Sequence, residues 1–299
     1  MNDRIKAAVL GSFVADALAL GVHWVYNTRV IDKKFGRIDG YLDPLTSYHK
    51  GKKAGDQTHY GDQMLVLMES LEKDSTFDLE IFASRWRRFF DTYTGYFDHA
   101  TQDTLHNLLS GKDFETCGSL SEDLGGACRI APLVPVFEDD PEKLVAAARK
   151  QTALTHNNAD VLAAAEFFSR TTATVLAGAK PLQAVDTVLD RHFKASSIET
   201  LVMEGLDSRA MDTRQTIADF GQACSVEVAL PGVVHIIARY TDNFEGALVE
   251  NIMAGGDSAA RGIPAAMILG AHHGLEAIPG KWLDGLASRE RVEQFLKGR

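Results

Sequence analysis

The spacing of apolar residues along the chain predicts several helices. In residues 63–71 the apolar positions recur at the i, i+3, i+4, i+7 spacing of an amphipathic helix. These positions are Met64, Leu67, Met68 and Leu71. Residues 79–93 combine apolar pairs with arginines in the same way, and the Ala-rich residues 159–177 predict a mostly buried helix that stops at Gly178.

Two further buried helices are predicted at 225–239 and 262–274, where Pro231 should kink the first and Pro264 should lie near the start of the second. The alternating apolar and polar runs that indicate a sheet are missing, and so are Pro/Ser-rich linkers. The pattern therefore predicts an all-α fold with one domain over residues 1–299. Residues 27–62 are polar and aperiodic, and a loop of that length in a compact domain is usually functional or disordered.

Composition narrows the possible environments and partners. The chain has 299 residues, of which 45% are hydrophobic, so it is long enough to bury a large core. A net charge of -10 argues against a nucleic-acid surface and against a polybasic membrane patch, but not against a small anionic ligand. Three widely spaced cysteines and an apolar N-terminal run broken by Asp16, without a cleavage site, predict a cytoplasmic protein with a buried first helix.

Asp16 is the first residue with candidate chemistry, because it interrupts the apolar residues 11–18 and is soon followed by His23 and Trp24. A buried aspartate must be paired, hydrogen-bonded or protonated, since an unpaired buried charge is very costly. A structural pair and a site role are equally good interpretations of Asp16.

Residues 55–63 form a polar turn that leads into the helix predicted at 63–71. The turn contains Gln57, His59, Tyr60 and Asp62, and a helix start offers free N–H groups and the positive end of the dipole. Asp62 could simply be the N-cap of the helix. Capping would not explain why an imidazole, a phenol and an amide occupy the same turn.

A third segment, 125–132, combines Gly125 with Arg129 in an apolar setting, where an arginine is expected to find a carboxylate or phosphate partner. His156 stands in a turn before the Ala-rich helix that could serve only as a cap. In the fourth segment, 254–262, the pair Gly255 and Gly256 allows close approach of a ligand to the backbone.

Asp257 follows that glycine pair and Arg261 comes four residues later. On a helix the two side chains could pair with each other. An Asp–Arg contact that only stabilises the turn is therefore an alternative to a ligand site.

Taken in order, these segments resemble the ADP-ribosylglycohydrolase family over nearly the whole chain, from about residue 5 to residue 286. The resemblance rests on seven blocks in the family's order. They are residues 11–18, 62–71, 125–133, 155–157, 228–231 with 244–248, 255–258, and 274–279 with 282–283. It implies an orthogonal multi-helix all-α fold, a central cleft with two divalent cations, usually magnesium, and hydrolysis of an ADP-ribose glycosidic bond.

The sequence departs from the family at its metal motifs. The positions of the family's Thr-Asp-Asp-Thr motif hold His59, Tyr60, Gly61 and Asp62. In the Gly-Gly-Asp-Thr-Asp-Thr motif, Asp257 and Ser258 are followed by two alanines, and the family's catalytic acid after the first block is His23. In the position of Arg261 the sequence resembles the branch of the family that contains the jellyfish J-type lens crystallins. The charge of Arg261 could replace that of a metal ion.

The resemblance and the departures lead to two hypotheses. The first is a glycosidic-bond hydrolase that acts on a small-molecule or ADP-ribosylated substrate and holds at most one weakly bound Mg²⁺. Its metal ligands would be Asp62, Asp257 and Ser258, since hard cations prefer about six oxygen ligands. Its catalytic groups would be Asp62, Asp257, His23 and His59, with an imidazole as acid or base near neutral pH.

The substrate of such a hydrolase would be bound by Asp16, Gln57, Tyr60, Gly125, Arg129, His156, Gly255, Gly256 and Arg261. The second hypothesis is a catalytically inactive ligand-binding or crystallin-like structural protein on the same fold. The hydrolase hypothesis requires that the turns before Gln63 and after Gly256 face one cavity.

Overall fold

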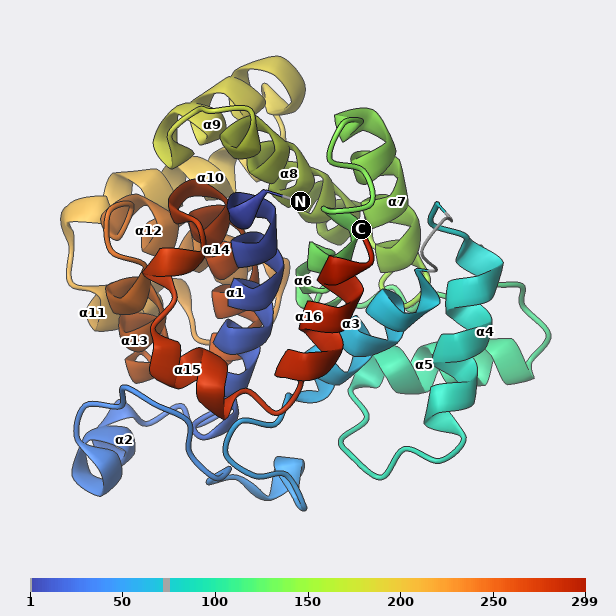
Figure 1. Cartoon of the computed structure of the whole chain (residues 1–299), viewed down its shortest axis with the longest axis horizontal. Coiled ribbons are helices and arrows are strands. Elements are labelled where there is room, and N and C mark those ends of the chain that lie inside the picture. Colours follow the sequence, from blue (N-terminus) through green and yellow to red (C-terminus); the bar gives the residue numbers. More distant parts are fainter. Residues whose placement is uncertain (1, 72–75) are drawn as a thin grey trace.

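The computed structural model describes residues 2–71 and 76–299, and this part of the chain forms sixteen α-helices with three isolated backbone bridges and no strand (Figure 1). The all-α prediction is confirmed. The helices are α1 (Asp3–Leu20), α2 (Thr28–Phe35), α3 (His59–Ser70), α4 (Leu79–Phe90), α5 (His99–Leu109), α6 (Gly125–Cys128), α7 (Pro141–Ala153), α8 (Ala159–Leu176), α9 (Pro181–Val188), α10 (Ser197–Asp207), α11 (Thr213–Phe220), α12 (Val226–Arg239), α13 (Phe244–Met253), α14 (Ser258–His273), α15 (Gly280–Gly285) and α16 (Arg289–Lys297).

Helices α1 and α14 pack against each other at the centre of the molecule, as Figure 1 shows. Nearly every residue of α1 and α14 is buried, and a helix that is apolar on all sides belongs in a core. The two backbones approach closely because Gly270 has no side chain. A Cβ at this position would lie 2.5 Å from the carbonyl oxygen of Ala7.

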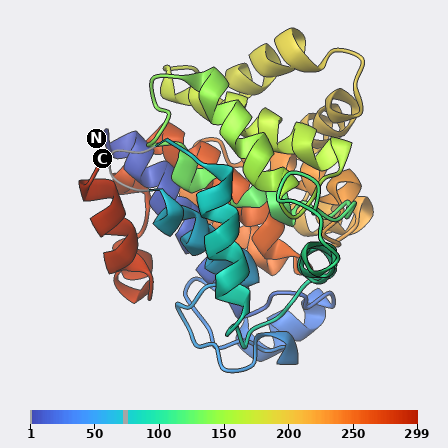
Figure 2. The ribbon, with the colours of Figure 1, turned by 90° about the vertical axis from the view of Figure 1, so that its right-hand side faces the viewer.

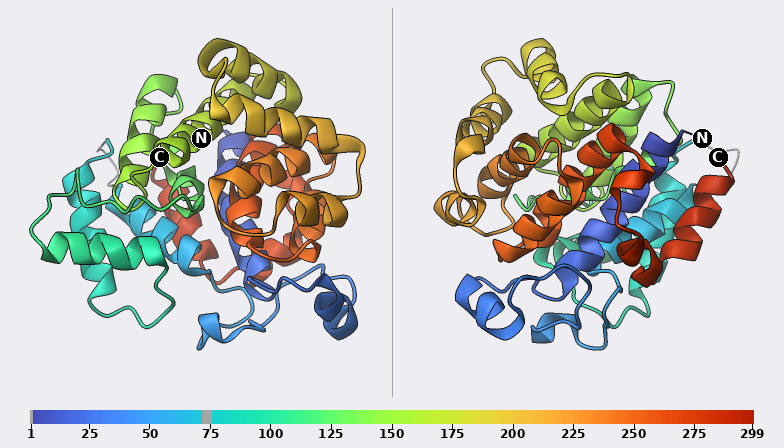
Figure 3. Two further views of the ribbon diagram at one scale, coloured as in Figure 1. Left: turned by 180° about the vertical axis from the view of Figure 1, so that it is seen from behind. Right: turned by 60° about the vertical axis from the view of Figure 1, so that its left-hand side comes forward.

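The remaining helices surround this pair. Helix α8 packs on α7 and α14, and α12 packs on α10 and α14. Helices α4 and α5 lie on the side of the molecule opposite α10 to α12, which the turned views of Figures 2 and 3 also show. No helix among the described residues is long and apolar enough to cross a membrane.

The long N-terminal loop predicted at 27–62 is only partly irregular. It contains α2, whose N-cap Asn27 accepts a hydrogen bond from the Arg29 backbone, and a 3-10 turn at Ser47–His49. Helix α3 begins at His59, four residues before its predicted start. Its N-cap is Thr58, so the interpretation of Asp62 as the cap is wrong.

Helix α14 begins at Ser258, four residues before its predicted start, so Pro264 lies inside the helix. A proline there removes the N–H that would bond to the Ala260 carbonyl. The Cys128 thiol donates to that oxygen at 3.1 Å instead. The neighbouring α6 thus provides the donor that the proline lacks. Pro231 lies inside α12 as predicted.

Candidate functional site

Three turns meet at the N-terminal ends of α3 and α14. The Tyr60 hydroxyl donates to Asp257 Oδ2 at 2.8 Å, which joins the turn before α3 to the turn before α14. The Trp24 N–H donates to the Gly256 carbonyl at 2.9 Å, which adds the segment after α1. Gly256 has φ +63, and a Cβ there would lie 2.3 Å from the Gln222 carbonyl oxygen, so this close contact requires glycine.

Asp16 anchors the turn before α3 from inside the core. Its carboxylate accepts from the Thr58 N–H at 2.8 Å and from the Thr58 hydroxyl, and the Gln57 amide donates to Oδ2 at 2.8 Å in the orientation that gives both of its ends a partner. Burial raises the pKa of Asp16 to about 7, against the opposing effect of the Thr58 hydrogen bonds. A Cβ at Gly61 would lie 2.1 Å from this carboxylate. Asp16 therefore positions the turn and does not line the cavity described below.

Asp62 does not join Asp257. It lies two residues beyond Tyr60, and residues two apart in an α-helix point about 200° away from each other. Its carboxylate instead binds the Lys52 ammonium at 2.7 and 2.6 Å and the Tyr93 hydroxyl at 2.6 Å. The two turns converge through Tyr60, while Asp62 and Asp257 have separate hydrogen-bond partners.

Asp257 is fully buried and caps α14. It accepts from the Ala260 N–H at 2.9 Å, from Tyr60, and from the Trp24 indole at 3.4 Å, while burial raises its pKa. The predicted contact between Asp257 and Arg261 is not formed as a hydrogen bond. Arg261 donates instead to the Gly255 carbonyl and to the Asn251 side chain, because its position places the guanidinium under the glycine turn.

The predicted magnesium ligands do not fit a metal site. Within residues 2–71 and 76–299, no group of three or more His, Cys, Asp or Glu side chains is arranged to hold a metal ion. Asp62 is occupied by Lys52, and both oxygens of Asp257 already accept hydrogen bonds. Ser258 adds only one hydroxyl, which falls short of the oxygen shell that Mg²⁺ prefers.

A cavity of about 200 Å³ opens beside Tyr60. Five aromatic side chains, two carboxylates, an imidazole and a thiol line it. These residues are Trp24, Tyr26, Tyr48, Tyr60, Tyr96, Asp98, His99, Asp123 and Cys224. Trp24 has φ +62, a left-handed conformation that costs on the order of 1–3 kcal/mol for a bulky residue. Strain of this kind persists only where the surrounding structure holds it, and here the Trp24 N–H is bonded to the Gly256 carbonyl.

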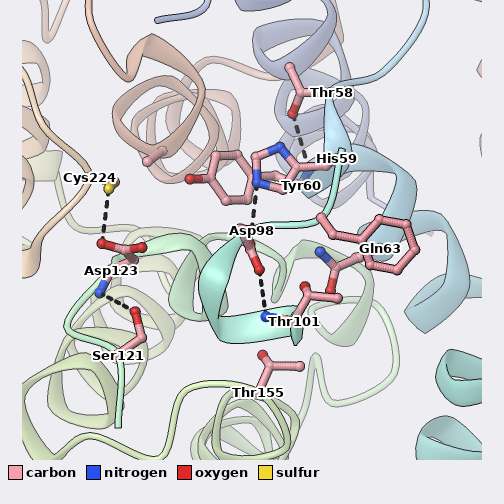
Figure 4. Close-up of polar contacts among 12 residues, drawn as sticks. Thr58, His59, Tyr60, Gln63, Asp98, Thr101, Ser121, Asp123, Thr155 and Cys224 are labelled. Carbon is pink, nitrogen blue, oxygen red and sulfur yellow. Dashed lines mark hydrogen bonds and ion pairs between the residues drawn. The ribbon is translucent and has the colours of Figure 1, made fainter. Parts of the chain in front are cut away.

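Asp98 is the buried carboxylate of the cavity. It caps α5 by accepting from the Thr101 N–H at 2.6 Å, and His59 Nε2 lies 3.3 Å from its other oxygen (Figure 4). Burial alone would raise the pKa of Asp98. Contact with His59, together with nearby His156 and the Thr101 hydrogen bond, outweighs burial and holds this pKa well below its usual range. Asp98 is therefore ionised at neutral pH.

The histidines behind the cavity are packed together. His23 Nε2 lies 3.7 Å from Asp257 Oδ1 with both side chains buried, and His49 stacks on Trp24 with ring centroids 5.5 Å apart. Burial lowers the pKa of His23 and lowers that of His49 to about 3, so both imidazoles are neutral at pH 7. The structure thus brings His23 and His59 to the same site, one beside Asp257 and the other beside Asp98.

The remaining predicted substrate-binding residues lie in α6, at its end or against it. A Cβ at Gly125 would lie 2.4 Å from the Tyr60 ring, so this glycine lets α6 approach. Arg129 donates to the Gln63 amide oxygen and the Thr155 hydroxyl rather than to a carboxylate. His156 bonds to Thr155 at 2.9 Å and leaves the capping of α8 to Asn158.

Sequence reasoning missed most of the cavity wall. Tyr26, Tyr48, Tyr96, Asp98 and Asp123 were not among the predicted site residues, because they lie in loops without helical periodicity. The sequence feature that could have indicated this lining is the recurrence of tyrosines in polar, aperiodic segments.

Comparison with known proteins agrees with this architecture. Residues 1–298 match the sequence profile of the ADP-ribosylglycohydrolase family. A solved structure titled ADP-ribosylglycohydrolase-related protein complex superimposes with a TM-score of 0.78 at 24% identity, covering 99% of this chain and 96% of the other. At this level of sequence identity, the structural likeness shows that the two chains share a fold.

Two relatives match over almost their full length. An uncharacterized protein of Archaeoglobus fulgidus is 26% identical, with 99% of this chain and 95% of the relative covered. Crystallin J1A of Tripedalia cystophora is 22% identical, with 99% and 96% covered. The chain is an all-α protein of the glycohydrolase type. It belongs to the ADP-ribosylglycohydrolase family, and its relatives include J1 crystallins.

Proposed function

We propose that this protein hydrolyses a glycosidic bond of an ADP-ribosyl or related nucleotide substrate without a two-metal centre. The observation that carries the proposal is Asp98, an ionised carboxylate that faces an aromatic cavity and has His59 behind it. Glycoside cleavage passes through an oxocarbenium-like state, and a carboxylate beside the sugar can stabilise it or activate water.

The other site residues support this role. Asp123 is the second carboxylate in the cavity, and glycosidases commonly use a pair. The aromatic rings offer faces on which a base or sugar can stack. Asp257 and His23 lie behind Tyr60 and Trp24, so they act as positioning residues rather than as groups that touch the substrate.

An inactive ligand-binding or crystallin-like protein is the second candidate. One reason is the ion pair between Asp62 and Lys52, which engages the acid that lies in the family's first metal motif. The other is the similarity to crystallin J1A. In this case the cavity would bind a ligand without turnover.

The test is hydrolysis of ADP-ribosyl-arginine and ADP-ribosyl-serine peptides, followed by chromatography of released ADP-ribose, with Mg²⁺ or with EDTA. We expect turnover in both buffers and a loss of about 100-fold or more in Asp98→Asn. Asp139→Asn, an exposed aspartate, is the matched control.

Full activity of Asp98→Asn would refute the role of Asp98. If neither peptide is cleaved but calorimetry detects ADP-ribose binding, the inactive alternative replaces the proposal.

A further inference from the structure

Three aromatic rings of the cavity meet nearly at right angles. The ring centroids of Trp24 and Tyr48 are 5.1 Å apart with an interplanar angle of 87°, and those of Trp24 and Tyr96 are 4.8 Å apart at 71°. Tyr48 and Tyr96 are 5.4 Å apart at 82°. All three pairs are edge-to-face contacts, so the rings pack against one another and form a rigid aromatic part of the cavity lining.

The charge of the lining is negative. Asp98 and Asp123 face the cavity, and its lining residues include no lysine or arginine. Asp123 accepts a hydrogen bond from the Cys224 thiol at 2.9 Å (Figure 4). Among the ion pairs of the described residues, none joins Asp123 to a cationic side chain.

The nearby guanidinium groups do not supply the missing charge at the wall. Arg129 and Arg261 are fully buried and donate to Gln63, Thr155, Gly255 and Asn251. Both therefore lie behind the lining.

The size and the mouth of the cavity favour a small group, either a small ligand or one end of a larger substrate. A volume of about 200 Å³ is below the ~300 Å³ at which drug-sized pockets begin. Tyr26 and Tyr48 are each 52% exposed, although large aromatic side chains are usually covered. Both rings line the cavity, so their exposed faces are available to an incoming group.

From this combination we infer that the cavity is a binding site for a small methylated ammonium ion, held against the exposed rings of Tyr26 and Tyr48 with Asp123 as counter-ion. The negative face of an aromatic ring attracts a cation, and a quaternary ammonium group is weakly hydrated enough to enter an aromatic cavity. A carboxylate at the wall adds a Coulombic attraction that a neutral ligand would not feel.

This inference rests on the cavity used in the proposed function, but it concerns binding and needs no hydrolysis. The competing explanation for an aromatic cavity is stacking of a neutral nucleobase. Charge distinguishes the two, because stacking does not depend on Asp123.

The experiment is isothermal titration of the full chain with choline, with its neutral isostere 3,3-dimethylbutan-1-ol, and with adenosine. We expect choline to bind about tenfold more tightly than the isostere, as a cation–π contact of moderate strength predicts. Tyr48→Leu and Asp123→Asn should each weaken choline binding about tenfold. Tyr48→Phe keeps the ring face and should stay within about threefold, and Asp139→Asn should bind like the unmodified chain.

Equal affinity for choline and its isostere, or no choline binding, would overturn the inference. Adenosine binding that is tighter than choline binding and unchanged in Asp123→Asn would assign the cavity to a neutral base. The hydrolysis assay is read separately. Choline binding without turnover refutes only the proposed function, and turnover without choline binding refutes only this inference.

Discussion

Replacing Thr58 with valine tests how the turn before α3 is held. The Thr58 side chain makes two hydrogen bonds: its hydroxyl donates to Asp16, and the same oxygen accepts from the Tyr60 N–H at 3.1 Å as the N-cap of α3. Valine has the same shape but can make neither bond. The next two residues, His59 and Tyr60, carry the contacts to Asp98 and Asp257.

The expected loss follows from these two bonds. Loss of an N-cap costs about 1 kcal/mol. Loss of a buried donor to a carboxyl group costs about 1–3 kcal/mol. Thr58→Val should therefore lower the free energy of unfolding by about 2–4 kcal/mol. Thr58→Ser keeps both bonds and removes one buried methyl group, which costs about 0.8 kcal/mol.

Urea denaturation followed by circular dichroism measures both variants against the unmodified chain. The valine variant should unfold at a clearly lower urea concentration than the serine variant and should also lose ligand binding in the cavity. Identical midpoints for valine and serine would show that the hydroxyl does not hold the turn, and the reasoning would fail.

Three further predictions use other parts of the site. His49→Gln should make the free energy of unfolding less sensitive to acid. In the folded chain the pKa of the buried His49 imidazole is lowered to about 3, whereas an unfolded histidine has a pKa of about 6.5. Between these values only the unfolded chain binds the proton, so stability falls as the pH drops, by at most about 1.4 kcal/mol per pH unit. Urea titrations at pH 7, 5.5 and 4.5 would show a flatter profile than the unmodified chain, and an unchanged profile would contradict it. Gly125→Ala should push Tyr60 aside and cost about 1–3 kcal/mol in thermal unfolding, whereas Gly280→Ala, which has open space, should change little. Addition of Mg²⁺ or EDTA should leave the Tm unchanged, and a rise with Mg²⁺ would reveal a metal site.

Helices were predictable where apolar spacing was regular. The periodic positions from Met64 to Met68 and the Ala-rich α8 are helical as expected, and Leu71, the last predicted position of the first pattern, is the C-cap of α3. Boundaries were less predictable, because they depend on capping by single side chains. The Thr58 hydroxyl starts α3 and the Asp257 carboxylate starts α14, both earlier than the apolar pattern indicates.

The sequence indicated that the turns before α3 and α14 meet, but it did not indicate which side chains make contact there. Asp62 was expected to face Asp257, yet helix geometry turns it toward Lys52, a residue in a loop whose path has no sequence period. Asp98 could not be identified as a site residue from the sequence, because its role depends on contact with His59, about forty residues away along the chain. Long-range placement of loops, not local propensity, decides these contacts.

The substitutions at the two metal-like motifs fit one another physically. A buried carboxylate such as Asp257 needs compensation wherever no cation lies beside it. Here Tyr60, at a position where the family has a metal aspartate, donates a hydroxyl to that carboxylate, and Arg261 lies one turn further along α14 with a fixed positive charge. An aspartate at position 60 would instead oppose Asp257 with a second negative charge. Recovery of a metal site would therefore require simultaneous change at both motifs, which is why the substituted residues are best understood as one compensated set.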